Sequence, residues 1–151
     1  MKKSFQNFAI LLFLMFMISC DKDQKLIAEI EGEYEVETII NFQNGQGIPA
    51  TFSAGRIYFE DCKMKDGTAG NCNGWYEFEG KSRVTFQYNT RKEGDDKVIA
   101  ITNLSNFTEP KIMGSFKFEI DGNNLILNGI EESGGADGST VKWYSDIRLS
   151  K

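Results

Sequence analysis

The chain contains no histidine among its 151 residues. Histidine is the commonest general base, the commonest metal ligand and the usual switch near neutral pH. Its absence excludes a Ser-His-Asp or Cys-His catalytic site built from this chain alone. No nucleophile motif and no metal-ligand set stands in its place. The sequence therefore predicts a protein that is not an enzyme and that uses no cofactor and no metal.

Proline and positive charge are also scarce. Two prolines stand against twelve Phe and five Tyr, a composition that favours β-strands. Lys and Arg number 17 against 22 Asp and Glu, which gives a net charge of −5. An acidic domain is a poor partner for nucleic acid, because phosphates require clusters of Lys and Arg. We interpret the acidity as a contribution to solubility.

The N-terminus has the layout of a secretory signal. Lys2 and Lys3 precede an apolar run, residues 8–18, that is too short to span a hydrocarbon core, which needs about 20 residues. The following sequence Met17-Ile18-Ser19-Cys20 resembles the lipobox of bacterial lipoproteins. The resemblance implies cleavage before Cys20 and acylation of its thiol and amino group. It predicts a lipid-anchored protein of the bacterial cell envelope, in the outer membrane, facing the periplasm or the cell surface.

Three parts of the chain follow from this processing. Residues 1–19 form the signal peptide, residues 20–25 a lipidated tether, and residues 26–151 one domain. Without the signal peptide the net charge of −5 becomes −7, since Lys2 and Lys3 are lost with it. The charged residues 21–25 are either a solvated linker or a signal for display at the cell surface.

The domain is predicted to be all-β, with a short helix in front. Leu26, Ile27 and Ile30 have helical spacing. From Tyr34 onward the pattern has a period of two, which indicates half-buried strands. In the first strand it places Tyr34, Val36, Thr38 and Ile40 on one face. The turn residues 44–47 and 121–124 and the Gly-rich loop 132–139 punctuate the pattern. The eight predicted strands lie at about 34–40, 54–62, 74–79, 83–88, 97–104, 112–120, 125–130 and 141–149.

Eight consecutive strands predict an antiparallel up-and-down barrel, because closure removes both exposed edges. The helical turn, the sequence Gly32-Glu33-Tyr34 and the eight-strand meander together resemble the lipocalin-like (calycin-type) lipoproteins. That family opens on Gly-x-Trp, whose Trp closes the bottom of the barrel, and Tyr34 occupies that position here. The resemblance implies a barrel with one open end and an apolar cavity.

Cys62 and Cys72 are the two cysteines that lipidation would leave. They flank a loop at the facing ends of two predicted strands, in an exported and oxidising setting. We predict a disulfide between them. Free buried thiols are the alternative, while metal binding and redox chemistry are disfavoured by the missing histidine and by the ten-residue spacing.

The alternation also predicts which side chains point into the barrel. They are Tyr34, Val36, Ile57, Phe59, Tyr76, Phe78, Val84, Phe86, Tyr88, Phe116, Phe118, Leu125, Leu127, Trp143, Ile147 and Leu149. An eight-stranded barrel either fills with side chains or holds one small ligand, so the aromatic members are core or pocket wall. Gly55, Gly114 and Gly129 share this face, which indicates unfilled space or strand bends. The candidate pocket wall consists of Phe59, Tyr76, Phe78, Phe86, Tyr88, Phe116, Phe118 and Trp143.

Two functional hypotheses follow. The first is a barrel that binds a small apolar or amphipathic molecule, with Tyr76, Tyr88 or Trp143 as a polar handle. The second is a non-enzymatic accessory subunit of an envelope complex, which would bind proteins through the loops 63–71 or 132–139.

Overall fold

The computed structural model describes residues 21–63, 71–104, 109–134 and 141–151. The predicted signal peptide, the lipidation site Cys20 and most of the loop 63–71 lie outside the described residues. The elements are α2 (Asp21–Ile30), β1 (Gly32–Gln43), β2 (Gln46–Pro49), β3 (Gly55–Phe59), β4 (Cys72–Phe78), β5 (Val84–Glu93), β6 (Asp96–Asn103), β7 (Gly114–Asp121), β8 (Asn124–Gly129), β9 (Glu132–Gly134) and β10 (Val141–Ser150).

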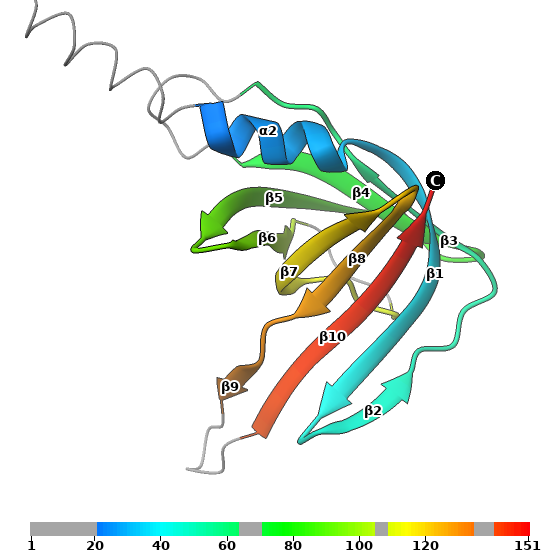
Figure 1. Cartoon of the computed structure of the whole chain (residues 1–151). Helices are drawn as coiled ribbons and strands as arrows, with labels where there is room; N and C mark the ends of the chain where they lie inside the picture. The colour runs from blue at the N-terminus through cyan, green and yellow to red at the C-terminus, as the bar shows by residue number, and fades with distance from the viewer. Residues whose placement is uncertain (1–20, 64–70, 105–108, 135–140) are drawn as a thin grey trace, which may run out of the picture.

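Eight antiparallel strands close into a barrel, as the alternation predicted. The hydrogen-bonded order runs β1, β3, β4, β5, β6, β7, β8 and β10, and β10 pairs back onto β1. The closing ladder is long, extending from the pair Glu35 and Ser150 to the pair Gln43 and Trp143. Consecutive strands of the barrel are neighbours all the way round (Figure 1). The up-and-down connectivity is therefore confirmed.

β1 and β10 continue beyond the barrel and carry two strands that the sequence analysis missed. β2 pairs with residues 40–43 of β1, and β9 pairs with residues 141–143 of β10. We call this four-stranded extension the lip: β2, residues 40–43, residues 141–145 and β9. It lies at the lower end of the barrel in Figure 1. The predictions of a simple break at residues 44–49 and of a loop beginning at residue 132 are wrong.

The β1–β2 hairpin has an identifiable cause. Asn44 and Gly45 adopt φ values of 51° and 81°. Positive φ at both central residues is the signature of a two-residue hairpin turn, for which Asn-Gly is a preferred sequence. The chain therefore reverses tightly and pairs Gln46 with Gln43. Pro49 ends β2, which is an edge strand, where a missing N–H is tolerated.

A β-bulge divides β1 into two faces. The alternation predicted Tyr34, Val36, Thr38 and Ile40 on one side, but Thr38 is exposed and Ile39 is buried. Val36 pairs with Leu149 and Thr38 with the next residue, Arg148, so one residue of β1 is extra. A single extra residue moves every later side chain to the opposite face. The predicted orientation of Thr38 and Ile40 is wrong for this reason.

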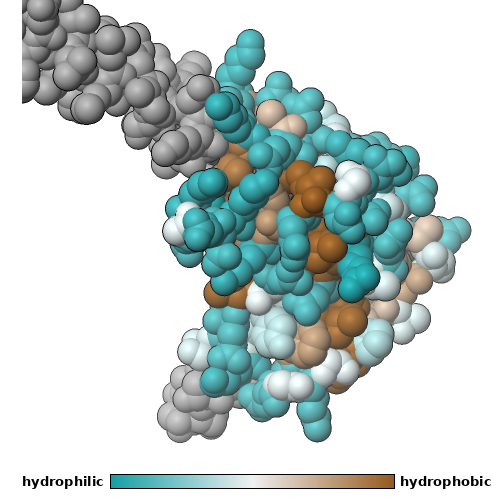
Figure 2. Space-filling view, viewed as in Figure 1, coloured by the Kyte–Doolittle hydropathy of each residue, from teal (hydrophilic) through white to brown (hydrophobic). Residues whose placement is uncertain are grey.

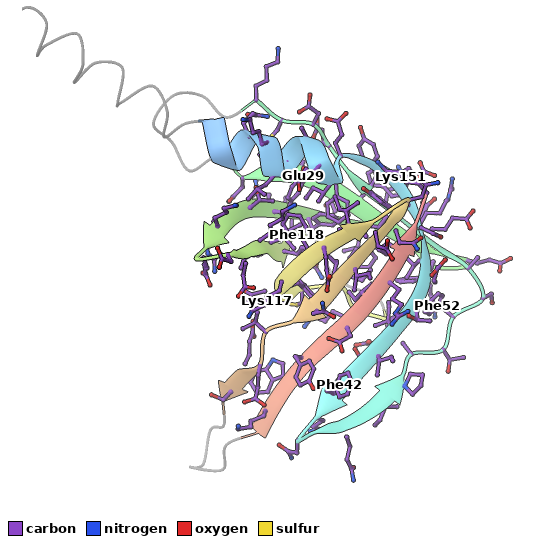
Figure 3. All side chains as sticks on the ribbon, viewed as in Figure 1. Glu29, Phe42, Phe52, Lys117, Phe118 and Lys151 are labelled. Atoms are coloured by element: carbon purple, nitrogen blue, oxygen red, sulfur yellow. A yellow bond between two sulfur atoms is a disulfide. The ribbon has the colours of Figure 1, made fainter. Side chains whose placement is uncertain are left out.

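α2 closes one end of the barrel. It begins at Asp21, so residues 21–25, which were predicted as part of the tether, are helical. Leu26, Ile27 and Ile30 are buried and belong to the core. On the surface, Glu29, which is labelled in Figure 3, pairs with Lys97 at 2.6 Å. Gly32, with φ of 113°, lets the chain turn directly from α2 into β1.

The predicted disulfide is confirmed. Cys62 and Cys72 are bonded, with their Cα atoms 5.5 Å apart. The bridge joins the segment after β3 to the first residue of β4. The side-chain amide of Gln24 donates a hydrogen bond to the Cys62 carbonyl at 3.0 Å, which ties α2 to this bridge. Helix, disulfide and the two strands thus form one closed end.

The core occupies the half of the barrel next to α2. The predicted inward residues are buried with the exception of Trp143, whose side chain is 43% exposed because it lies on the lip. Five aromatic rings interlock through centroid distances between 5.3 and 6.3 Å. These rings are Phe59, Tyr76, Phe78, Phe86 and Tyr88.

Candidate functional site

A cavity of about 500 Å³ opens where the lip meets the barrel, at the end opposite α2. Its volume lies within the usual range for small-molecule pockets, about 300–1,000 Å³. Five strands and two connections bound it: β1, β6, β7, β9, β10, the segment before β7 and the segment between β8 and β9. It is lined by Asn41, Phe42, Ala100, Ile101, Thr102, Glu109, Lys111, Met113, Gly114, Ser115, Phe116, Ile130, Glu132, Trp143, Tyr144 and Ser145.

The floor of the cavity is apolar. Ile101 and Phe116 are 2% and 1% exposed and connect the cavity to the core. They are near neighbours across β6 and β7, where Phe116 pairs with Ile99 and Gly114 with Ile101. Met113 and Trp143 stand at the rim and are 40% and 43% exposed. An apolar tail entering from solvent would therefore meet apolar surface from rim to floor.

Half of the residues that line the cavity carry a polar or charged side chain. Ser145 donates a hydrogen bond from Oγ to Oδ1 of Asn41 at 2.8 Å, which links β10 to β1 at the wall. The charged lining residues are Glu109, Lys111 and Glu132, so the cavity carries one more negative than positive charge. The cavity therefore combines an apolar floor with polar lining groups, which suits a molecule that has both an apolar and a polar part.

The structure brings two of the eight predicted pocket-wall residues to the cavity. Phe116 lies in its floor and Trp143 at its rim. Phe59, Tyr76, Phe78, Phe86, Tyr88 and Phe118 are at most 4% exposed and lie in the core. Figure 3 shows Phe118 in the barrel, well away from Phe42 on the lip. Most of the predicted aromatic set therefore fills the barrel next to α2.

The tyrosine hydroxyls already have partners. Tyr88 donates from its hydroxyl to the Glu60 carbonyl at 2.6 Å, and burial raises the pKa of Tyr88. Tyr76 accepts a hydrogen bond from Nδ2 of Asn103 at 3.2 Å, and burial raises the pKa of Tyr76 as well. Both hydroxyls are neutral and form hydrogen bonds inside the barrel. Of the three predicted polar handles, Trp143 alone lines the cavity.

The three inward glycines have different roles. A Cβ on Gly55 would lie 2.5 Å from the Phe78 ring, and one on Gly129 would lie 2.5 Å from the Ser145 carbonyl oxygen. At these positions the missing side chain makes room for a neighbour. Gly114 lines the cavity, where the nearest atom to a Cβ would be Oε1 of Glu132 at 3.6 Å. The open space beside Gly114 fits the expected unfilled space, while its φ of 124°, which disfavours other residues, fits the expected strand bend.

A second hollow of about 570 Å³ lies between β1, β3 and β4. Its lining includes Arg56 and Glu77, which pair with each other at 2.6 Å. Arg56 also pairs with Glu33 at 3.1 Å, and Glu77 pairs with Arg83 at 3.0 Å. Because these charges satisfy one another at an exposed surface, this hollow offers a ligand less than the cavity at the lip does.

Sequence reasoning missed the residues that the lip contributes. Asn41, Phe42 and Ser145 lie on parts of β1 and β10 beyond the barrel, where Phe42 stacks on Tyr144 at 4.5 Å. The Asn44-Gly45 turn was the available signal, because it extends β1 as a hairpin arm. Lys111 and Met113 lie in the irregular segment before β7, although the predicted strand 112–120 included Met113.

In the described part of the chain, no group of three or more His, Cys, Asp or Glu side chains could hold a metal ion. Among the same residues, no helix has both the length and the apolar character needed to cross a membrane. Comparisons with protein-family profiles, with curated proteins and with solved structures found no match to this chain.

Proposed function

We propose that this protein is a lipid-anchored binding protein of the bacterial cell envelope, and that its barrel takes a small amphipathic molecule into the cavity at the lip. The observation that carries the proposal is the open cavity of about 500 Å³, with its apolar floor and its polar lining groups. The proposed role is binding without catalysis. The absence of histidine from the chain supports that restriction.

The anchor is proposed from the lipobox at Met17-Ile18-Ser19-Cys20. Each buried CH₂ of an acyl chain contributes about 0.8 kcal/mol, so two or three chains would hold the protein on a membrane permanently. Cys20 directly precedes α2, and α2 covers the end of the barrel opposite the cavity (Figure 1). An anchored molecule would thus present its cavity away from the outer membrane.

The likeness to lipocalin-like lipoproteins is part of the proposal. Tyr34 stands where that family has its barrel-closing Trp. It is 4% exposed, meets Phe59 edge-to-face at 6.1 Å and lies under the Lys151 amine at 4.7 Å. This buried ring lies near the start of β1, directly after α2, and its position supports the resemblance.

Anchoring is tested with Cys20→Ser in a bacterial host. The variant should leave the membrane fraction or remain as an uncleaved precursor, and metabolic labelling with a clickable fatty acid should be lost. Unchanged labelling and membrane attachment would refute lipidation at Cys20.

Ligand binding is tested by the fluorescence of Trp143. The chain has two tryptophans, and Trp75 lies on the outer surface under the Arg83 guanidinium at 3.7 Å. In Trp75→Phe, the signal from Trp143 should change saturably as a twelve-carbon neutral amphiphile, dodecyl maltoside, is added below its micelle concentration. Trp143→Phe, which retains Trp75, should show no such change. A flat titration of Trp75→Phe by neutral, anionic and cationic amphiphiles alike would end the proposal.

A matched pair of variants locates the binding. Met113 and Leu104 are both exposed, at 40% and 57%, but Met113 lines the cavity and Leu104 does not. Met113→Asn removes apolar surface from the cavity and should weaken dodecyl maltoside binding several-fold. Leu104→Asn removes similar surface elsewhere and should leave the affinity unchanged. Equal effects of the two would indicate adsorption on the surface rather than a pocket.

The alternative function, a protein-interaction module, is favoured by the edge of the lip. Ile48 on β2 is 62% exposed, and β2 is the last strand in the hydrogen-bonded order, so among the described strands it has one unpaired edge. A photo-crosslinker at Gln46 in intact envelopes should then capture one defined partner, and Ile48→Asp should abolish that product. A chain that crosslinks to nothing would count against this alternative.

A further inference from the structure

The rim of the cavity places a carboxylate beside an indole. Glu132 on β9 and Trp143 on β10 are direct cross-strand partners in the lip, and both line the cavity. Partners opposite each other in an antiparallel ladder point to the same face. The Glu132 carboxylate also reaches toward β7, where Oε1 lies 3.6 Å from the position of a Cβ on Gly114. It therefore extends across the opening between β9 and β7.

Trp143 differs from Trp75 and Tyr34, each of which has a positively charged side chain over its ring. Arg83 lies over Trp75 at 3.7 Å, and Lys151 lies over Tyr34 at 4.7 Å. Within the described ranges, no cation or aromatic ring stacks on Trp143, whose side chain is 43% exposed. The indole packs against Gly134, where a Cβ would lie 3.0 Å from the ring. An indole face next to a carboxylate favours a positive charge above it.

The Glu132 carboxylate also has no ion-pair partner among the described residues. Glu131, one residue earlier, pairs with Lys142 at 2.7 Å. Glu132 and Glu109 form no ion pair with any lysine or arginine of the described residues. Lys111, the one cation in the lining, already has an interaction of its own. The cavity thus has negative charge to neutralise and an aromatic surface to offer.

We infer that the cavity selects amphiphiles with a cationic headgroup, an alkylated or protonated amine, over neutral and anionic ones. The ammonium group would lie between Glu132 and the Trp143 indole, and the apolar tail would follow Ile101 and Phe116 to the floor. Desolvation at the rim strengthens both contacts with the cation. This inference rests on the proposed ligand-binding function and specifies its headgroup.

Three probes with the same twelve-carbon tail length test the headgroup preference: dodecyltrimethylammonium, dodecyl maltoside and dodecanoate. Isothermal titration calorimetry measures the affinity of each probe below its micelle concentration. The expected order of affinity is cationic, neutral, anionic, with at least a tenfold advantage of the cation over the neutral probe. Raised salt should reduce the advantage of the cation. Equal affinities, or a preference for dodecanoate, would overturn the inference while leaving the proposed function standing. No binding of any probe would remove the proposed function itself.

Variants assign the preference to the two side chains. Glu132→Gln keeps the shape and removes the charge, and it should reduce the cation-to-maltoside affinity ratio several-fold without changing maltoside binding. Trp143→Leu keeps an apolar wall and removes the aromatic face, and it should reduce the same ratio. Glu131→Gln is the matched control, because Glu131 pairs with Lys142 and does not line the cavity. A ratio that Glu131→Gln lowers as much as Glu132→Gln would refute the assignment to the rim.

Discussion

The hydroxyl of Tyr88 donates a hydrogen bond to the backbone carbonyl of Glu60 at 2.6 Å. Tyr88 comes from β5 and is 1% exposed, while Glu60 directly follows β3. The bond fastens the chain entering the disulfide-bridged segment onto the aromatic core. A single buried ring thus connects the packing of the barrel to the geometry of its closed end.

Tyr88→Phe should therefore lower the free energy of unfolding by more than the removal of a hydroxyl at the surface would. The ring stays in place, but the Glu60 carbonyl loses its partner, and a stranded polar group of this kind costs about 1–3 kcal/mol. Urea unfolding followed by far-UV circular dichroism measures the loss. Tyr58→Phe, at a half-exposed ring on the outer face of β3, is the control and should change stability by less than about 0.5 kcal/mol. Equal stability of the two variants would show that the Tyr88 bond contributes nothing net.

Stability should fall at alkaline pH because of the buried tyrosines. Burial, aided by the nearby Glu31 carboxylate, raises the pKa of Tyr34 to about 12, and burial raises the pKa of Tyr88 too. Above the unfolded pKa of about 10, the unfolded chain loses protons that the native state keeps. The free energy of unfolding must then decrease as pH rises. Below that range these two groups contribute no pH dependence.

The measurement is the urea midpoint between pH 8 and pH 11.5. Each tyrosine that stays neutral only in the native state steepens the decline by up to about 1.4 kcal/mol per pH unit. Tyr34→Phe and Tyr88→Phe should each flatten the decline above pH 10, whatever their effect at pH 8. A wild-type midpoint that stays constant up to pH 11.5 would contradict the assignment of raised pKa values to these residues.

Much of the barrel could be predicted because its strands are half-buried. Ile57 and Phe59 on β3, and Phe86 and Tyr88 on β5, occupy the core face that strict alternation assigns to them. Closure followed from strand number and short connections. These properties are local, so the sequence displays them directly.

The bulge and the lip depend on longer-range geometry. At the bulge, Ile39 and Ile40 are adjacent and equally apolar, so hydrophobicity alone does not reveal which of them faces the core. The cavity forms because β1 and β10, which pair with each other, extend past the other strands of the barrel. How far a strand extends depends on partner strands that are distant in the sequence. A short stretch of sequence therefore does not reveal it.

Reduction of the Cys62–Cys72 disulfide should destabilise the domain without unfolding it at room temperature. The bridge closes a loop of sequence separation 10, for which chain entropy predicts a contribution of about 2.5–3 kcal/mol. The double variant Cys62→Ala/Cys72→Ala should lose about that amount in urea unfolding, and a reducing agent should have no effect on it. Cys72 is fully buried, so alanine is preferred to serine. Identical stabilities of wild type with and without reductant would show that the bridge does not constrain the unfolded chain.

Gly129→Ala should damage the closure of the barrel itself. A Cβ at this position would lie 2.5 Å from the Ser145 carbonyl oxygen and 2.7 Å from the Ser145 nitrogen, both backbone atoms of β10. Because backbone cannot rotate away as a flexible side chain can, β8 and β10 would have to separate. The shift would also strain the 3.0 Å hydrogen bond from the Gly129 N–H to Oδ1 of Asp146. We expect a loss of about 2–3 kcal/mol in urea unfolding, with faster amide exchange in β8 and β10. The control is Ser133→Ala, at an exposed position on β9, which should leave both measurements unchanged. A Gly129→Ala protein as stable as this control would mean that β8 and β10 do not approach each other as closely as described.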